Sequence, residues 1–298
     1  MVQLGPNRYG KAEVRVVHVA RGVALGGGAV GDLVTDRNVS SSLSGDVAGC
    51  YLTGDNANVL ATDTQKNTVY AFSKKLGHVE PERLARELAA HFVGTQAPIT
   101  RARVSVEQYG WTRIEDRPNS FHRTGDCVRT TTVIHDETQG VSVVSGLRDL
   151  VVLNTTNSEF HGFPRDEFTT LAETTDRMLA TSVEASWRYR AEAVQADDID
   201  WADDFAQAKA ALLATFAGTY SYSLQQTLFA IGSLIIESIP DICEVRLSMP
   251  NRHHFLVDLD PFGLANDNEV YYAADRPYGL IEGTVLADDA GPEGLAWT

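Results

Sequence analysis

The order of predicted strands and helices occurs twice along this sequence. In the first half, two strand-like segments precede two helix-like segments, and two long strand-like segments follow them. The second half repeats this order, offset by roughly 140 residues. Such a grouping of strands and helices is typical of α+β folds, in which helices cover one face of an antiparallel sheet. We therefore expect an α+β fold of two similar tandem domains, residues 1–139 and 140–298, each with a helix pair on its sheet.

Two hydrophobic periods distinguish the strands from the helices. Along residues 9–21, apolar and polar residues alternate, as they do in a half-buried strand. In the helical segments the apolar residues recur every three or four positions, as Leu84, Leu88 and Phe92 do after Pro81. The predicted strands cover residues 9–21, 32–43, 101–114, 121–137, 141–153, 178–190, 243–249, 254–259 and 279–285, and the predicted helices cover residues 63–76, 81–92, 201–216 and 224–236.

Charge and composition exclude several classes of function. The formal net charge of -15 argues against a nucleic-acid partner, because binding phosphates requires a basic face, and it means that any anion site must be locally positive. No apolar run is long enough to span a bilayer, and no secretory signal is found, so we expect a cytoplasmic protein without a membrane partner. Cys50, Cys127 and Cys243 lie far apart and are expected to be reduced thiols.

Two motifs suggest cofactors but fit poorly. The glycine-rich stretch from Gly26 to Gly31 has the spacing of a dinucleotide fingerprint, yet it leads into a strand-like run instead of a helix. A hairpin loop is the better interpretation. The adjacent His253 and His254 would point to opposite faces of a strand, and His161 has no obvious ligand partner. We therefore expect neither a metal site nor a cofactor.

Five segments carry polar or aromatic residues that a packed core does not require. Each has an ordinary structural explanation: Lys11 as a solvated edge charge, Thr62 and Asp63 as a helix cap, and Gln225 as part of a second cap. A single phenylalanine or arginine in residues 158–163 or 174–177 could be explained by core packing or by surface charge. The five segments are residues 9–11, 61–70, 158–163 together with 174–177, 224–227, and 248–255.

Taken together and in this order, the five segments resemble the motif set of the urate oxidases, or uricases. The resemblance extends over nearly the whole chain, including residues 274–281, and its most specific parts are residues 62–70 and 250–255. Arg252 stands where the family usually carries lysine, and Met249 where leucine is common. The peroxisomal tail that is frequent in the family is absent, which is typical of a bacterial-type member.

The resemblance implies a set of site residues. Arg177 would bind the flat urate anion through its planar guanidinium fork, Gln225 would hold its edge, and Phe160 would stack on its ring. Thr62 and Asp63 would meet the ligand at a helix N-terminus, which favours anions. The implied substrate-binding residues are Thr62, Asp63, Phe160, Leu171, Arg177, Leu224 (through its backbone), Gln225 and Asn251, and the implied catalytic residues are Lys11, Thr62 and His253.

The implied reaction is the oxidation of urate by dioxygen to 5-hydroxyisourate and hydrogen peroxide, as a step of purine degradation. Because the urate anion is itself the reductant, this oxidoreductase would need no cofactor. Lys11 and Thr62, in a relay with His253, would move the proton, which requires that the pKa of Lys11 be lowered by burial or by nearby cations. Asn251 would hold dioxygen.

The family fold is the tunnelling fold, or T-fold, with two such domains in each chain and four chains in a homotetramer. The resemblance implies active sites shared between subunits. Two alternatives stay open: another T-fold enzyme that binds a purine or pterin, and a catalytically inactive purine-binding homologue. The first relies on zinc or a nucleophilic cysteine, for which no motif is found, and the intact set of Lys11, Thr62, Asn251 and His253 argues against the second.

Overall fold

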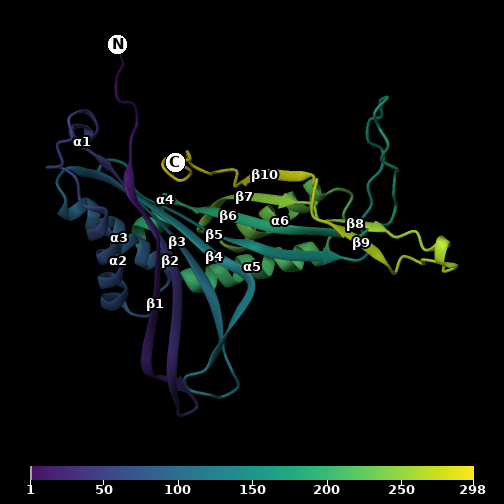
Figure 1. Cartoon of the computed structure of the whole chain (residues 1–298), viewed down its shortest axis with the longest axis horizontal. Helices are drawn as coiled ribbons and strands as arrows, with labels where there is room; N and C mark the ends of the chain where they lie inside the picture. Colours follow the sequence, from purple (N-terminus) through teal and green to yellow (C-terminus); the bar gives the residue numbers. More distant parts are fainter. Residues whose placement is uncertain (1) are drawn as a thin grey trace. The chain divides into compact units, whose positions relative to one another are not determined.

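The computed structural model describes residues 2–298, which divide into two compact units. Unit 1 holds the chain up to Gly146 together with Arg188–Asp203 and Gly291–Thr298, and unit 2 holds Leu147–Trp187 and Asp204–Ala290. In each unit, helices lie against a sheet (Figure 1), which confirms the predicted α+β class. The division into domains at residues 139 and 140 remains a prediction.

Unit 1 is built on long strands in the order β1-β2-β3-β4-β5. Their bounds are β1 (Tyr9–Gly26), β2 (Ala29–Gly45), β3 (Ile99–Arg113), β4 (Phe121–Asp136) and β5 (Gly140–Asn154), of which β5 continues into unit 2. β1 to β4 pair in antiparallel fashion. Gly27 and Gly28, with φ of 58° and 82°, form the turn between β1 and β2, so the glycine-rich stretch is a hairpin, as predicted, and not a nucleotide loop.

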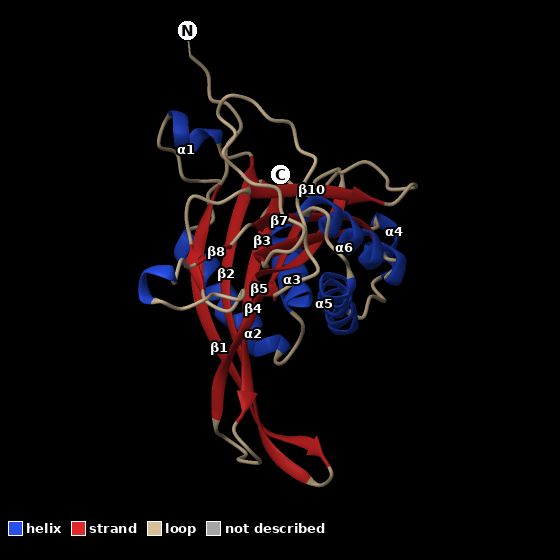
Figure 2. Ribbon diagram, turned by 90° about the vertical axis from the view of Figure 1, so that its right-hand side faces the viewer, coloured by secondary structure: helices blue, strands red, loops and turns tan. Residues whose placement is uncertain are grey.

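Among the described residues, the helices that lie wholly in unit 1 are α1 (Ala48–Leu52), α2 (Thr62–Leu76), α3 (Pro81–Thr95) and α4 (Ala191–Ala196). The α3 residues Leu84, Leu88 and Phe92 are fully buried, and α3 packs on β3 and β4 while α2 packs on β1. Figure 2 shows α2 and α3 against the strands. The short α1 and α4 were not predicted, because five or six residues are too few to show a helical period.

Unit 2 repeats the plan with strands in the order β5-β6-β7-β10. Their bounds are β6 (Leu179–Tyr189), β7 (Ile242–Pro250) and β10 (Leu280–Leu286), and the helices are α5 (Trp201–Gly218) and α6 (Leu224–Ser238). α6 packs on β7 and β10. It does so closely, since a Cβ on Gly232 would lie 2.5 Å from a methyl of Val285.

A separate two-stranded sheet completes unit 2. β8 (His253–Leu256) pairs with β9 (Tyr271–Ala274), and the 3-10 helix η1 (Asp260–Phe262) lies between them in the chain. The predicted strand over residues 254–259 is therefore shorter than expected and starts earlier, and β9 was not predicted. Within residues 2–298, no helix is both long enough and apolar enough to cross a membrane.

A buried ionic network joins the elements of unit 1. The α3 carboxylate of Glu82 is fully buried and accepts hydrogen bonds from Arg129 Nη2 on β4 at 2.8 Å and from the Ser145 hydroxyl on β5 at 2.7 Å. Arg129 also donates to Glu80 at 2.6 Å and to the Trp201 carbonyl at 2.7 Å. Burial raises the pKa of Glu82, and the positive charge of Arg129 opposes that rise.

We predict that Arg129→Met destabilises the fold, because it leaves the Glu82 carboxylate buried without its ionic partner. The free energy of unfolding should fall by about 3–5 kcal/mol, the cost of breaking a buried pair. The double variant with Glu82→Gln should regain part of the lost free energy of unfolding. The control is Arg83→Met, which removes an arginine of half-exposed surface pairs and should cost at most about 1 kcal/mol. Denaturant unfolding measures all three, and equal losses for Arg129→Met and Arg83→Met would contradict the prediction.

Candidate active site

Unit 2 contains a cavity of about 350 Å³ that gathers most of the predicted site residues. Its wall comes from the segment between β5 and β6, the start of α6, and the junction of β7 and β8. The predicted residues that line it are Phe160, Leu171, Arg177, Leu224, Gln225, Asn251 and His253. Segments almost a hundred residues apart in sequence thus meet in one hollow, as the substrate-binding set requires.

Backbone hydrogen bonds within the segment between β5 and β6 hold Phe160 and Arg177 close together. The Phe160 amide donates to the Thr174 carbonyl at 2.9 Å, and the Arg177 amide donates to the Ser158 carbonyl at 2.9 Å. The Arg177 guanidinium carbon lies 5.2 Å from the centre of the Phe160 ring. An aromatic face and a cation therefore border the same space, which is suited to a flat anion.

Most of the Arg177 guanidinium remains available to a ligand. Its Nε donates to the Ser158 hydroxyl at 3.2 Å, and no bond from its two Nη atoms occurs in the described residues. Burial lowers the pKa of Arg177, although an arginine stays charged at neutral pH. An anion bound to the two Nη groups would therefore stabilise a partly desolvated cation.

The start of α6 assigns the capping role to residues other than Gln225. The Ser223 hydroxyl accepts a hydrogen bond from the backbone N–H of Gln226 at 3.2 Å. The side-chain Oε1 of Gln226 accepts from the backbone N–H of Tyr222 at 2.9 Å. The exposed side chain of Gln225 makes no hydrogen bond among the described residues, and it lines the cavity. The cap explanation for Gln225 is therefore wrong, and its amide is available to a ligand.

Asn251 and His253 lie where β7 ends and β8 begins. The backbone N–H of Asn251 donates to the Gly279 carbonyl at 2.8 Å, and the backbone N–H of Arg252 donates to the Ala180 carbonyl at 2.8 Å. The half-exposed His253 ring stacks on Phe255 with 5.8 Å between ring centres. Backbone bonds to two other segments thus position the stretch of main chain that carries both polar side chains.

The remaining predicted residues, Lys11, Thr62 and Asp63, lie in unit 1. The N-cap of α2 is Ala61, which has no capping side chain, so Thr62 is the first helical residue and does not cap. The exposed Asp63 binds Lys66, and it accepts from Asn67 Nδ2 at 3.0 Å. These contacts, chiefly the one with Lys66, lower the pKa of Asp63, and the charge of Lys11 adds to the effect. Lys11 on β1 is therefore close to the start of α2.

The cavity also has apolar wall residues to which the sequence assigned no role. Met178, Phe255 and Ile281 line it, and Phe163 stacks on Phe160 with 5.1 Å between ring centres and 13° between ring planes. Phe163, Phe255 and Ile281 belong to motif segments, but apolar wall residues look like core residues in a sequence, so no local signal assigned them to the cavity. In the part of the chain that the structure describes, no group of three or more histidine, cysteine or acidic side chains could hold a metal ion.

Comparison of the fold with solved structures gives its class. The crystal structure of uricase from Arthrobacter globiformis has a TM-score of 0.91 and 46% sequence identity, covering 98% of this chain and 97% of that one. A uricase structure from Bacillus fastidious has a TM-score of 0.79 at 22% identity, over 95% of this chain and 94% of that one. The expected α+β T-fold is therefore confirmed.

Sequence comparison gives the family. The model of the uricase family matches residues 7–134 and 143–282. The uricase of Arthrobacter globiformis is 46% identical over 297 residues, covering 100% of this chain and 94% of that protein. The uricase of Dictyostelium discoideum is 38% identical over 291 residues, covering 96% of this chain and 98% of that protein. This chain belongs to the uricase family, as the motif resemblance predicted.

The geometry at α6 predicts that Ser223 and Gln225 respond differently to substitution. Ser223→Ala should lower the free energy of unfolding by about 1 kcal/mol, because it removes the cap. Gln225→Ala should leave stability nearly unchanged, since its side chain makes no hydrogen bond within residues 2–298, but it should weaken ligand binding. Thermal unfolding and titration with a non-reactive urate analogue measure the two effects. A large stability loss in Gln225→Ala would return that residue to a structural role.

Proposed function

We propose that this protein oxidises urate with dioxygen to 5-hydroxyisourate and hydrogen peroxide, without a metal or an organic cofactor. The observation that carries the proposal is the cavity in which the available Nη groups of Arg177, the ring of Phe160 and the unbonded amide of Gln225 converge. Family membership supports the same conclusion. Neither alternative function is favoured by a specific observation.

The proposed binding mode follows from the shape and charge of urate. The flat ring stacks on Phe160, and two parallel bonds join its edge to Arg177. Gln225 offers one donor and one acceptor side by side to the carbonyl and N–H groups of the opposite edge, with help from the Leu224 amide. Leu171 closes the apolar wall. The arginine supplies the local positive charge that a chain of net charge -15 otherwise lacks.

The proposed catalytic groups complete deprotonation of urate and place dioxygen over its ring. Lys11, Thr62 and His253 form a proton relay, and Asn251 holds dioxygen and then the water that replaces peroxide. Two observations support these roles. Thr62 has no capping function, and the charge of Lys11 acts on Asp63 at the same helix start. At that N-terminus, unpaired amides and the positive end of the helix dipole favour an anion, so Thr62 and Asp63 contact the substrate there.

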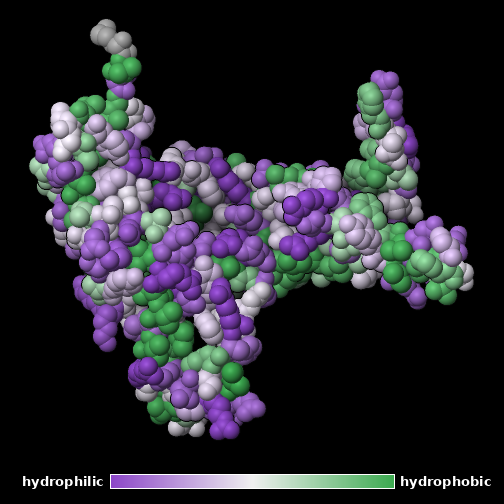
Figure 3. Space-filling model, in the orientation of Figure 1, coloured by the Kyte–Doolittle hydropathy of each residue, from purple (hydrophilic) through white to green (hydrophobic). Residues whose placement is uncertain are grey.

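We also propose that the active site is shared between subunits of a homotetramer. Lys11, Thr62 and Asp63 belong to unit 1, whereas the cavity residues belong to unit 2. β1 and β10 are terminal strands in the sheet order, so each has an edge open to another chain. Large apolar side chains are also exposed on the β8–β9 segment, such as Phe255 and Leu256. Figure 3 shows hydrophobic surface in this part of unit 2. The cytoplasmic location remains a prediction of the sequence.

The experiment that tests the function follows urate absorbance and oxygen uptake by chelator-treated protein. The wild-type protein should consume urate and oxygen. Arg177→Lys should bind a non-reactive urate analogue at least about 2 kcal/mol more weakly, because a point charge cannot form two parallel bonds. Near wild-type affinity would remove Arg177 from the site. Loss of all turnover on chelation, restored by one metal, would contradict the cofactor-independent reaction. Binding without any turnover would favour the inactive homologue.

Mixed oligomers test whether the site is shared. Thr62→Ala and Arg177→Ala are each expected to be inactive alone. If each site takes one group of residues from either chain, a mixed pair contains one intact and one doubly damaged site. Co-refolding equal amounts should then restore roughly a quarter of the wild-type activity, since half the pairs are mixed and half their sites are intact. Mixed oligomers that form but stay inactive would show that each chain builds its own site.

A further inference from the structure

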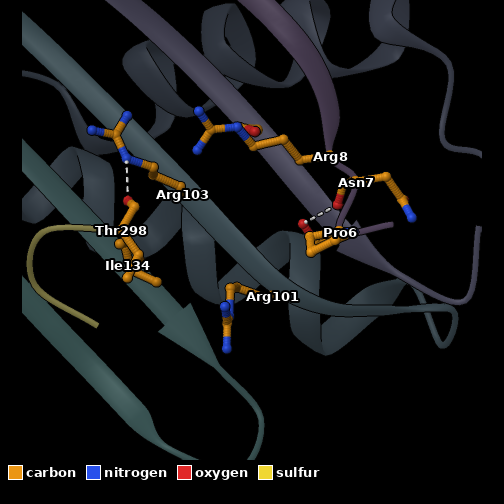
Figure 4. Close-up of a pocket in the computed structure, with 9 residues that line it drawn as sticks. Pro6, Asn7, Arg8, Arg101, Arg103, Ile134 and Thr298 are labelled. Carbon is orange, nitrogen blue, oxygen red and sulfur yellow. Dashed lines mark hydrogen bonds between the residues drawn. The ribbon is translucent and has the colours of Figure 1, made fainter. Parts of the chain in front are cut away.

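A second pocket, in unit 1, has a cationic wall with no place in the proposed reaction. Its volume is about 290 Å³, and Arg8, Arg101 and Arg103 line it (Figure 4). Ser42 and Ser44 add hydroxyl groups to the same wall. All of these residues belong to unit 1, whereas the proposed urate cavity lies in unit 2. Three guanidinium groups around one hollow are unexpected in a chain of net charge -15.

Strand register explains how the floor of this pocket forms. Ser42 on β2 lies opposite Arg103 on β3, which lies opposite Ile134 on β4, and the next row joins Ser44 to Arg101. Because residues two apart on a strand point to the same face, the two rows form one surface. The intervening positions face the helices instead, as the bond between the Ser41 hydroxyl and Gln65 on α2 shows. The arginines therefore lie on the face that the helices leave uncovered.

The internal contacts of the three arginines leave donors for a ligand. Arg101 donates its Nε to Asp136 at 2.7 Å. Arg103 donates its Nε to the main-chain oxygen of Thr298 at 3.2 Å and its Nη1 to the Ser105 hydroxyl at 2.7 Å. In the described part of the chain, the guanidinium of Arg8 makes no hydrogen bond or ion pair. Even with the Asp136 carboxylate and the main-chain oxygen of Thr298 engaged, the three guanidinium groups leave the cluster with excess positive charge.

The cluster is electrostatically unfavourable without an anion. Burial lowers the pKa of Arg103, and the nearby charge of Arg8 lowers it further, so the two cations lie close enough to repel. Their side chains extend in the same direction in Figure 4. An anion between them would convert this repulsion into two charge-assisted contacts.

We propose that this pocket binds a phosphate group, either as inorganic phosphate or on a small phosphorylated molecule. A planar carboxylate satisfies a single guanidinium fork, whereas a tetrahedral oxyanion offers acceptors in several directions. The three arginines come from β3 and the segment before β1, and together with the Ser42 hydroxyl on β2 they favour the second kind of ligand. Occupancy stabilises unit 1, because a ligand that binds only the folded state raises its stability.

Calorimetric titration of the full-length protein tests the proposal. Inorganic phosphate and adenosine monophosphate are the two probes, and sodium chloride at matched ionic strength is the reference. Phosphate should bind wild type and raise its unfolding midpoint above the value in chloride. Tighter binding of the nucleotide would assign the site to a phosphorylated metabolite, and binding of phosphate alone would assign it to the free ion. Both results support the proposal.

Variants locate the binding. Arg8→Gln should weaken phosphate binding by about tenfold or more, the effect of one charge-assisted contact. Arg21→Gln removes the same charge from an exposed position elsewhere in unit 1 and should bind phosphate like wild type. Arg177→Ala should also bind normally, which separates this pocket from the urate cavity. The unfolding midpoint of Arg8→Gln without phosphate shows whether it is folded. Phosphate effects equal to those of chloride, or unchanged affinity in Arg8→Gln, would overturn the proposal.

Discussion

The alternation of side chains along the long strands is the constraint on which the rest of this structure depends. In each unit, one face of the long strands carries small and apolar residues, and the helices bury it; Ala102 and Val104 on β3 are fully buried in this way. The opposite face is free to carry charge, as Arg101 and Arg103 do on the same strand. Since a strand cannot shift by one residue without exchanging its two faces, the apolar pattern also fixes the positions of the charged residues.

Charge is distributed so that a strongly acidic chain still offers places for anions. In unit 2, Arg177 is half-buried, and its Nη groups are left unbonded by the fold. In unit 1, the arginines of the second pocket retain donors in the same way. By contrast, Arg129 is engaged within the fold, because Glu80, Glu82 and the Trp201 carbonyl all accept hydrogen bonds from it. The partners of an arginine, more than its burial, therefore distinguish a ligand-binding role from a structural one.

Helix capping separates the two possible roles of the polar residues at the helix starts. In the sequence, Thr62 and Gln225 fit a cap and a binding site equally well. In the structure, Ala61 occupies the N-cap of α2, and Ser223 with Gln226 caps α6. Capping therefore explains neither Thr62 nor Gln225. The distinction depends on backbone geometry at a single position, and sequence patterns locate helix ends to within a few residues only.

The sequence by itself determined the order, type and approximate bounds of the long elements, because these follow from local periodicity. It also determined the family, because the motif segments are local. Only the tertiary structure decided that Phe160, Arg177, Gln225 and Asn251 line one cavity, since that depends on packing between distant segments. It alone showed the pairing of β8 with β9 and the arginine pocket of unit 1. The physical reason is that Arg8, Arg101 and Arg103 are unremarkable as separate surface charges, and only the register of β1 against β2 and of β2 against β3 brings Arg8 close to the two arginines of β3.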